Sequence, residues 1–109
     1  MPTLQDVTHG RLSIDEAVLD EYCRRWKIAK LALFGSALRD DFNAASDIDL
    51  LVTYKPDAAW SLLVGAEIEL AEKLGRKVDL VSRRVIESSY NHSRRKMILE
   101  SAVPVYVAG

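Results

Sequence analysis

The sequence predicts a small α/β sandwich that forms a single domain over residues 1–109. Short apolar runs alternate with longer segments in which apolar residues recur every three to four positions, in the order α-β-(short α)-β-α-β-α. The chain has 109 residues, of which 49% are hydrophobic and 28% charged. This length is enough for one hydrophobic core and too short for two.

The first helix is predicted to begin near Ser13 and to run to Trp26. Ser13 and Glu16 have the spacing of a capping box, and the apolar residues that follow share one face. These residues are Ile14, Val18, Leu19, Tyr22, Cys23 and Trp26. Because Cys23 lies on the apolar face, we interpret it as a small core residue. Residues 1–10 show no periodicity and are predicted to form a loosely held arm.

Two strands are predicted on either side of a polar segment. The first covers Ile28–Phe34 and ends at Gly35, and the second covers Ile48–Thr53 and is closed by Pro56. Between them, Ala37–Asp41 fits a short helix. A longer helix is then predicted over residues 58–74.

The third strand is predicted over Lys77–Ser82, after Gly75 ends the long helix. Because a helix joins the second and third strands, we expect them to be parallel neighbours with a right-handed connection. A helical pattern follows to Ala102, with a break near Asn91. The last apolar residues, 105–107, fit a short edge strand.

Composition excludes several classes of protein. The net charge of −1 provides no basic surplus for nonspecific nucleic-acid binding, and a local basic patch is the alternative that it leaves open. The single cysteine excludes an internal disulfide and fits a reducing compartment. The sequence has no charged-then-apolar leader, and no apolar run approaches the ~20 residues of a membrane span. We therefore predict a cytoplasmic protein without a membrane partner.

Three aspartates suggest a metal site. Asp47 and Asp49 lie two residues apart at the start of the second strand, so their side chains share a face. Asp79 lies within the third strand and joins them if the two strands are neighbours. Two Mg²⁺ ions roughly 3.5–4 Å apart would neutralise the three carboxylates, activate an attacking oxygen and stabilise a leaving pyrophosphate. In the alternative interpretation, Asp47 caps a turn, Asp49 faces solvent and Asp79 pairs with an arginine.

The turn before the aspartates suggests phosphate binding. Gly35 lets the backbone approach a ligand closely, and Ser36 adds a hydroxyl beside backbone N–H groups at a helix start. A Gly-Ser pair alone is usually just a turn, so its value depends on the aspartates that follow. Arg39 is either a further triphosphate contact or an exposed helix residue.

Gly35-Ser36, ten further residues and then Asp47-Ile48-Asp49 resemble the signature of the DNA polymerase β-like nucleotidyltransferase superfamily. The short chain is similar to its minimal nucleotidyltransferase (MNT) branch, and the resemblance covers nearly all of residues 28–107. It implies the nucleotidyltransferase fold, with a small mixed β-sheet and helices packed mainly on one face.

The resemblance also implies roles for the candidate residues. Gly35 and Ser36 would hold the triphosphate of ATP, with Arg39 as a further nucleotide contact. Asp47 and Asp49 would bind two Mg²⁺ ions, with Asp79 as the third carboxylate, and these three would be the catalytic residues.

For function, the resemblance implies transfer of AMP from ATP to a hydroxyl. The expected acceptor is a tyrosine of a HEPN-domain toxin, which makes the chain the antitoxin of a toxin–antitoxin pair. One alternative is a non-catalytic module that neutralises its partner by binding, because Ala37 and Asp40 replace an Arg and a Gly that family members often carry. Another is a nucleotidyltransferase for small molecules or RNA ends. A leftover apolar helix face also leaves room for a homo-oligomer.

Overall fold

The computed structural model describes residues 3–8, 10, 12–35, 47–57 and 62–108. The predicted short helix at 37–41 and the predicted start of the long helix at 58–61 lie outside the described residues. In chain order the elements are α1 (Leu4–Val7), α2 (Glu16–Arg25), β1 (Ile28–Phe34), β2 (Ile48–Tyr54), α3 (Leu62–Leu74), β3 (Val78–Ser82), α4 (Arg83–Glu87), α5 (His92–Ser101) and β4 (Val103–Val107).

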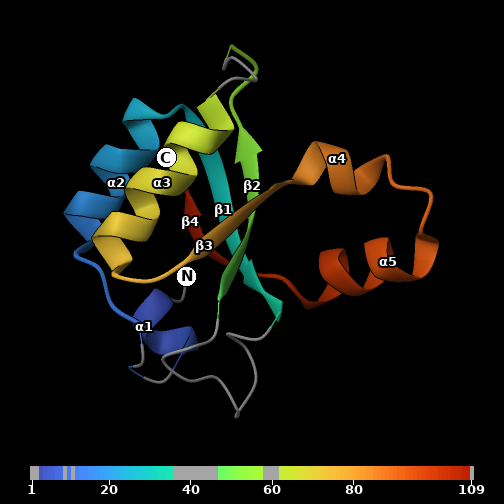
Figure 1. Ribbon diagram of the computed structural model, residues 1–109, viewed down its shortest axis with the longest axis horizontal. Helices are drawn as coiled ribbons and strands as arrows, with labels where there is room; N and C mark the ends of the chain where they lie inside the picture. The colour runs from blue at the N-terminus through green and yellow to red at the C-terminus, as the bar shows by residue number, and fades with distance from the viewer. Residues whose placement is uncertain (1–2, 9, 11, 36–46, 58–61, 109) are drawn as a thin grey trace.

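The four strands form one mixed sheet in the order β3-β2-β1-β4 (Figure 1). β1 pairs antiparallel with both β2 and β4, whereas β2 and β3 are parallel. The predicted parallel neighbours are therefore confirmed. The predicted mixed α/β fold is confirmed as well.

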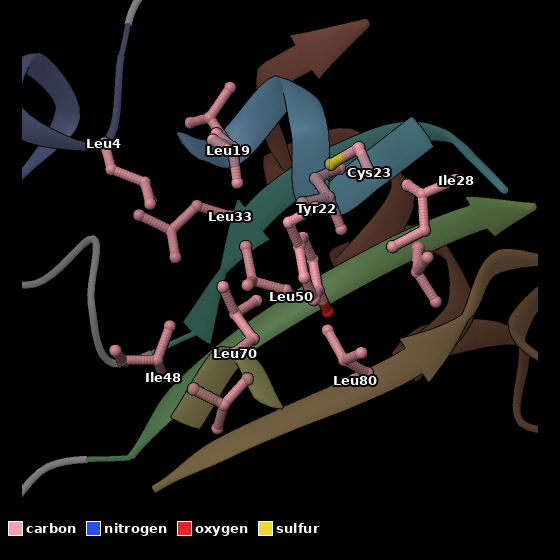
Figure 2. Packing of buried hydrophobic residues seen from close by; sticks show 14 of the residues in the cluster. Leu4, Leu19, Tyr22, Cys23, Ile28, Leu33, Ile48, Leu50, Leu70 and Leu80 are labelled. Carbon is pink, nitrogen blue, oxygen red and sulfur yellow. The ribbon is translucent and has the colours of Figure 1, made fainter. Parts of the chain in front are cut away.

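Helices α2 and α3 cover one face of the sheet, and the larger core cluster lies beneath them (Figure 1). Ile48, Leu50 and Leu80 contribute to this cluster from β2 and β3 (Figure 2). Tyr22 reaches into it from α2 and donates a hydrogen bond of 2.7 Å to the backbone oxygen of Ala66 in α3. This bond satisfies the phenolic hydroxyl in the core, where an unpaired polar group would be costly.

Helices α4 and α5 lie on the opposite side of the sheet (Figure 1). The smaller core cluster lies there and combines strand residues with one buried residue from each helix. Its buried members are Ala32, Phe34, Leu51, Ile86 and Ile98. Helices therefore lie on both faces of the sheet, whereas the expectation was that they pack mainly on one face; the larger cluster lies beneath α2 and α3.

The predicted loose arm at residues 1–10 is wrong for the part that the structure describes. Thr3 and Asp6 form a capping box that starts α1, and Leu4 is 2% exposed within the larger cluster. The buried hydroxyl of Thr8 donates to the backbone oxygen of Leu4 at 2.6 Å and accepts from the backbone N–H of Leu12 at 3.0 Å. Burial of one leucine and these local bonds hold the segment in place, although it has no helical periodicity.

The helix that follows begins later than predicted. Its N-cap is Asp15, not Ser13, because the Asp15 carboxylate accepts from the backbone N–H groups of Ala17 at 2.8 Å and Val18 at 3.4 Å. A carboxylate satisfies two free N–H groups here and also favours the positive end of the helix dipole. The predicted capping box therefore marks the right region and the wrong residue.

The chain's last elements confirm the predicted break and the predicted edge strand. Asn91 is the N-cap of α5, and its side chain accepts from the backbone N–H of Arg94 at 3.0 Å. β4 begins at Val103, before Pro104, and lies at the edge of the sheet. Proline is tolerated in this position because an edge strand has one side without ladder partners.

The remaining expectations concern Cys23 and membrane spans. Cys23 is buried, and burial raises the pKa of its thiol to about 12, so the side chain is a core residue and no nucleophile. Within the described ranges, no helix is both long and apolar enough to cross a membrane.

Candidate functional site

β2 and β3 place two carboxylates side by side. Asp49 and Asp79 are aligned in the parallel register of these strands, which lie about 4.8 Å apart in a typical sheet. Because Ile48 and Leu50 are buried in the larger cluster, alternation directs Asp49 to the opposite face, and the same holds for Asp79 between Val78 and Leu80. Both carboxylates therefore lie on the face that carries α4 and α5.

Gly35 brings backbone directly against one of these carboxylates. It follows the last residue of β1 and has a φ of +75°, which a residue with a side chain rarely adopts. A Cβ at this position would lie 2.5 Å from Oδ2 of Asp49. Glycine is thus required twice, for its conformation and for its small volume. The end of β1 and the start of β2 meet here, since Phe34 is aligned with Asp49.

Asp47 lies just before β2 and near a cation. Its Oδ2 is 3.6 Å from Nζ of Lys77, and both side chains are well exposed. The backbone N–H of Ile48 donates to the backbone oxygen of Lys77 at 3.0 Å, which ties the starts of β2 and β3 together. Asp47 therefore lies at the rim of the acidic platform, the name used here for the aligned pair Asp49 and Asp79 on β2 and β3.

A side chain of α3 forms a hydrogen bond with the backbone of the edge strand β3. The Glu67 carboxylate of α3 accepts from the backbone N–H of Leu80 at 2.8 Å. A sheet edge with free N–H groups is prone to pair with other chains, and this bond removes one such donor. It also fixes the strand on which Asp79 lies.

The structure brings together Gly35, Asp49 and Asp79 of the predicted site, with Asp47 at its rim. Ser36 and Arg39 lie outside the described residues. The predicted gathering of three carboxylates is only partly visible, because no three Asp, Glu, His or Cys side chains of the described ranges lie close enough to hold a metal ion. The alternative in which Asp79 pairs with an arginine is not observed, since its side chain has no ion pair or hydrogen bond within those ranges.

The two aligned carboxylates fit a divalent cation by their donor chemistry. They present oxygen ligands, which Mg²⁺ prefers, and they lie on adjacent rigid strands. Asp79 is only half-buried and has no protein partner within the described residues, so its lone pairs are available to a ligand. The backbone of Gly35 lies close beside the Asp49 carboxylate, and glycine adds no side chain at this point.

Lys77 is the residue that sequence reasoning missed. It lies two positions before Asp79, and the period of two along a strand would have placed it on the same face. The structure shows its amino group beside Asp47. A cation here offsets part of the negative charge of Asp47.

Comparison with known proteins places this chain in a family. Residues 16–105 match the family model described as "Nucleotidyltransferase domain". Two relatives come from Methanocaldococcus jannaschii. "Putative protein adenylyltransferase MJ1379" is 38% identical over 92 residues, which cover 83% of this chain and 88% of that protein. "Putative protein adenylyltransferase MJ1217" is 35% identical over 66 residues, which cover 61% of this chain and 67% of that protein.

Solved structures agree on the fold. One described as "Structure of putative minimal nucleotidyltransferase" is 29% identical, with a TM-score of 0.65, and the match covers 94% of this chain and 96% of that chain. One described as "Crystal structure of the toxin-antitoxin with AMP-PNP" is 22% identical, with a TM-score of 0.65 over 87% of this chain and 75% of that chain. The second likeness concerns the fold alone. This chain therefore belongs to the nucleotidyltransferase domain family, as one of its minimal nucleotidyltransferases.

Proposed function

We propose that this chain transfers AMP from ATP to a tyrosine hydroxyl of a partner protein. The observation that carries the proposal is the alignment of Asp49 with Asp79, on a shared face and beside the backbone of Gly35. This is a rigid acidic platform in a nucleotidyltransferase chain, and two of its relatives carry the name protein adenylyltransferase.

In this proposal Asp47, Asp49 and Asp79 hold two Mg²⁺ ions, and Gly35, Ser36 and Arg39 contact the triphosphate. Bound Mg²⁺ would neutralise charge on the phosphates and lower the pKa of an oxygen that it ligates. The parallel pairing of β2 and β3 holds Asp49 and Asp79 in place before substrate arrives. Such positioning is the main contribution that a protein makes to phosphoryl transfer.

The chemical step exchanges one P–O bond for another. The tyrosine oxygen forms a bond to the α-phosphorus of ATP, and the bond from that phosphorus to the α,β-bridging oxygen breaks. The products are an AMP–tyrosine ester and pyrophosphate. The hydroxyl proton passes to the carboxylate of Asp79, which acts as general base and then releases the proton to solvent.

For the partner we propose a HEPN-domain toxin, with this chain as the antitoxin in the cytoplasm. Solved toxin–antitoxin structures that share the fold support this choice, among them one described as "Crystal structure the toxin-antitoxin MntA-HepT", with a TM-score of 0.56.

The test uses the full chain, a HEPN-domain protein encoded by a neighbouring gene, Mg²⁺ and ATP labelled at the α-phosphate. We expect label on the partner, loss of label with EDTA, and loss of label when the acceptor tyrosine is changed to phenylalanine. Label that survives Asp79→Asn would contradict the assigned base. A stable complex without any label would show the alternative, a module that neutralises its partner by binding alone.

A further inference from the structure

The α4–α5 hairpin, residues 83–101, is strongly basic in a chain that is otherwise acidic. It contains five of the 15 Lys and Arg residues and two of the 16 Asp and Glu residues, for a net charge of +3. The rest of the chain has a net charge of −4. The five cations are Arg83, Arg84, Arg94, Arg95 and Lys96.

Part of this charge is not used within the fold. Arg94 and Lys96 are exposed, and neither side chain makes an ion pair or hydrogen bond in the part of the chain that the structure describes. Arg95 is different, because its guanidinium donates to the backbone oxygen of Glu87 at 3.3 Å and lies 2.7 Å from Nδ1 of His92. Arg95 thus joins the two helices, whereas Arg94 and Lys96 face solvent.

The position of these cations in α5 opposes helix stability. The helix begins at His92, and its first turn contains no acidic residue. Arg94 lies in this first turn, where the positive end of the helix dipole disfavours a cation, and Lys96 follows directly after it. A sequence that breaks a local rule without a local gain is expected at a functional surface.

Exposed apolar side chains accompany the cations. Tyr90, in the connection between the helices, is 98% exposed, Met97 is 59% exposed and Val85 is 52% exposed. Figure 1 shows α4 and α5 projecting from the sheet, with no described element outside them. Tyr, Met and Arg are the residues enriched in protein–protein interfaces, and four of the five cations are arginines.

We propose that the α4–α5 hairpin is the docking surface for an acidic, partly apolar face of the acceptor protein; this inference rests on the proposed function. The hairpin lies beside the site, because Ile86 and Ile98 pack in one cluster with Phe34, which is aligned with Asp49. A protein bound there would present a side chain to Asp79 on the same face of the sheet.

Charge favours a protein over a nucleic acid on this surface. The exposed Tyr90, Met97 and Val85 make the basic surface partly apolar, as in protein interfaces, and the net charge of −1 gives the chain no general attraction for a nucleic acid. A folded partner places its acidic groups against the hairpin and a neutral hydroxyl at the carboxylates. It would therefore satisfy both regions at once.

The test is the association of the HEPN-domain partner with the Arg94→Glu/Lys96→Glu double variant, in an Asp79→Asn background so that docking is measured without transfer. We expect the association rate at low salt to fall at least about tenfold relative to the Asp79→Asn chain that keeps Arg94 and Lys96. This difference in rate should shrink as the salt concentration rises. The matched control is Arg24→Glu/Lys73→Glu, which makes the same change in net charge on α2 and α3, on the other side of the sheet. This control should bind the partner as fast as the Asp79→Asn chain without charge reversal does.

Equal binding by both double variants would overturn the docking surface. So would binding of a 20-nucleotide RNA that competes with the partner and is lost in Arg94→Glu/Lys96→Glu. The proposed transfer is judged separately, by labelling with the Asp79-containing chain at saturating partner. A failure there leaves the docking result intact, and a failure of docking leaves the chemistry intact.

Discussion

The two faces of the sheet are built for different tasks. The face beneath α2 and α3 holds the larger cluster, which joins α1, α2, α3 and all four strands. The opposite face holds a cluster with five buried residues in the part of the chain that the structure describes, and two carboxylates share that face on aligned strand positions. The same strands serve both faces, since successive residues of β2 alternate between them.

This contrast shows how a chain of 109 residues can carry an acidic site. Burying a carboxylate without a partner is costly, and Asp49 and Asp79 lie on the face with the smaller core. Among the described residues, the larger cluster contains more buried side chains than the smaller one and draws on all four strands. Four experiments test this division, ordered from the largest expected effect to the smallest.

Asp79→Asn should reduce AMP transfer roughly 10³-fold, the usual contribution of a positioned general base. The substitution keeps the shape of the side chain and removes its charge and basicity, so the melting temperature and ATP binding should change little. Label transfer and thermal unfolding measure the two effects. Glu72→Gln, on the exposed side of α3, is the matched control and should transfer as the original chain does. A variant that unfolds instead would place Asp79 among the stabilising residues.

Leu50→Ala and Leu51→Ala compare the two faces within one strand. Leu50 is fully buried in the larger cluster, and Leu51 is buried in the smaller one. We expect losses in unfolding free energy of about 4 and about 3 kcal/mol, because the short helices α4 and α5 can relax into the smaller cavity. Urea unfolding at fixed temperature gives both values. A larger loss for Leu51→Ala would reverse the assignment of the stabilising face.

Gly35→Ala should destabilise the chain by about 2 kcal/mol and also reduce transfer, because a new methyl group collides with Asp49. Gly75→Ala is the matched control, since Gly75 has a φ of +71° and nothing within 4 Å of an added Cβ. It should cost about 1 kcal/mol from backbone strain alone and leave transfer unchanged. Equal effects of the two substitutions would show that contact with Asp49 has no role.

The pH dependence of the unfolding free energy should come partly from Glu69 in α3, on the face with the larger cluster. Arg25 donates to its carboxylate, with one N–O distance of 2.7 Å, and this pairing together with Trp26 Nε1 lowers the pKa of Glu69 to about 2. The folded pKa lies below the usual value of 4.5, so the stabilisation is present above pH 4.5 and is lost as the pH falls toward 2.

Glu69→Gln should therefore lower the unfolding free energy by about 1 kcal/mol at pH 7, the upper range for a half-exposed ion pair. Its difference from the original chain should shrink between pH 5 and pH 2 in urea titrations. Glu72→Gln, one turn further along the same helix, should retain the original pH profile. A constant difference across this range would remove Glu69 as the titrating group.

Periodicity was enough to predict the strands and most of the helices. Short apolar segments bounded by Gly or Pro are typical of strands. This pattern predicted strands over Ile28–Phe34 and from Ile48 onward, and both strands are observed. The arm at residues 1–10 failed because a four-residue helix is too short for a periodic pattern. It is held by Leu4 and Thr8, whose burial depends on distant residues.

For the site, the sequence alone predicted that Asp47, Asp49 and Asp79 belong together, since strand alternation and a helical crossover follow from local pattern and chirality. Tertiary structure decided the rest. It set the alignment of Asp49 with Asp79 and the place of Lys77 beside Asp47. It also brought Gly35 so close to Asp49 that an added Cβ would lie 2.5 Å from Oδ2 of the carboxylate. These features depend on the register between strands far apart in the chain, and register is a property of the whole packed core that no local stretch of residues contains.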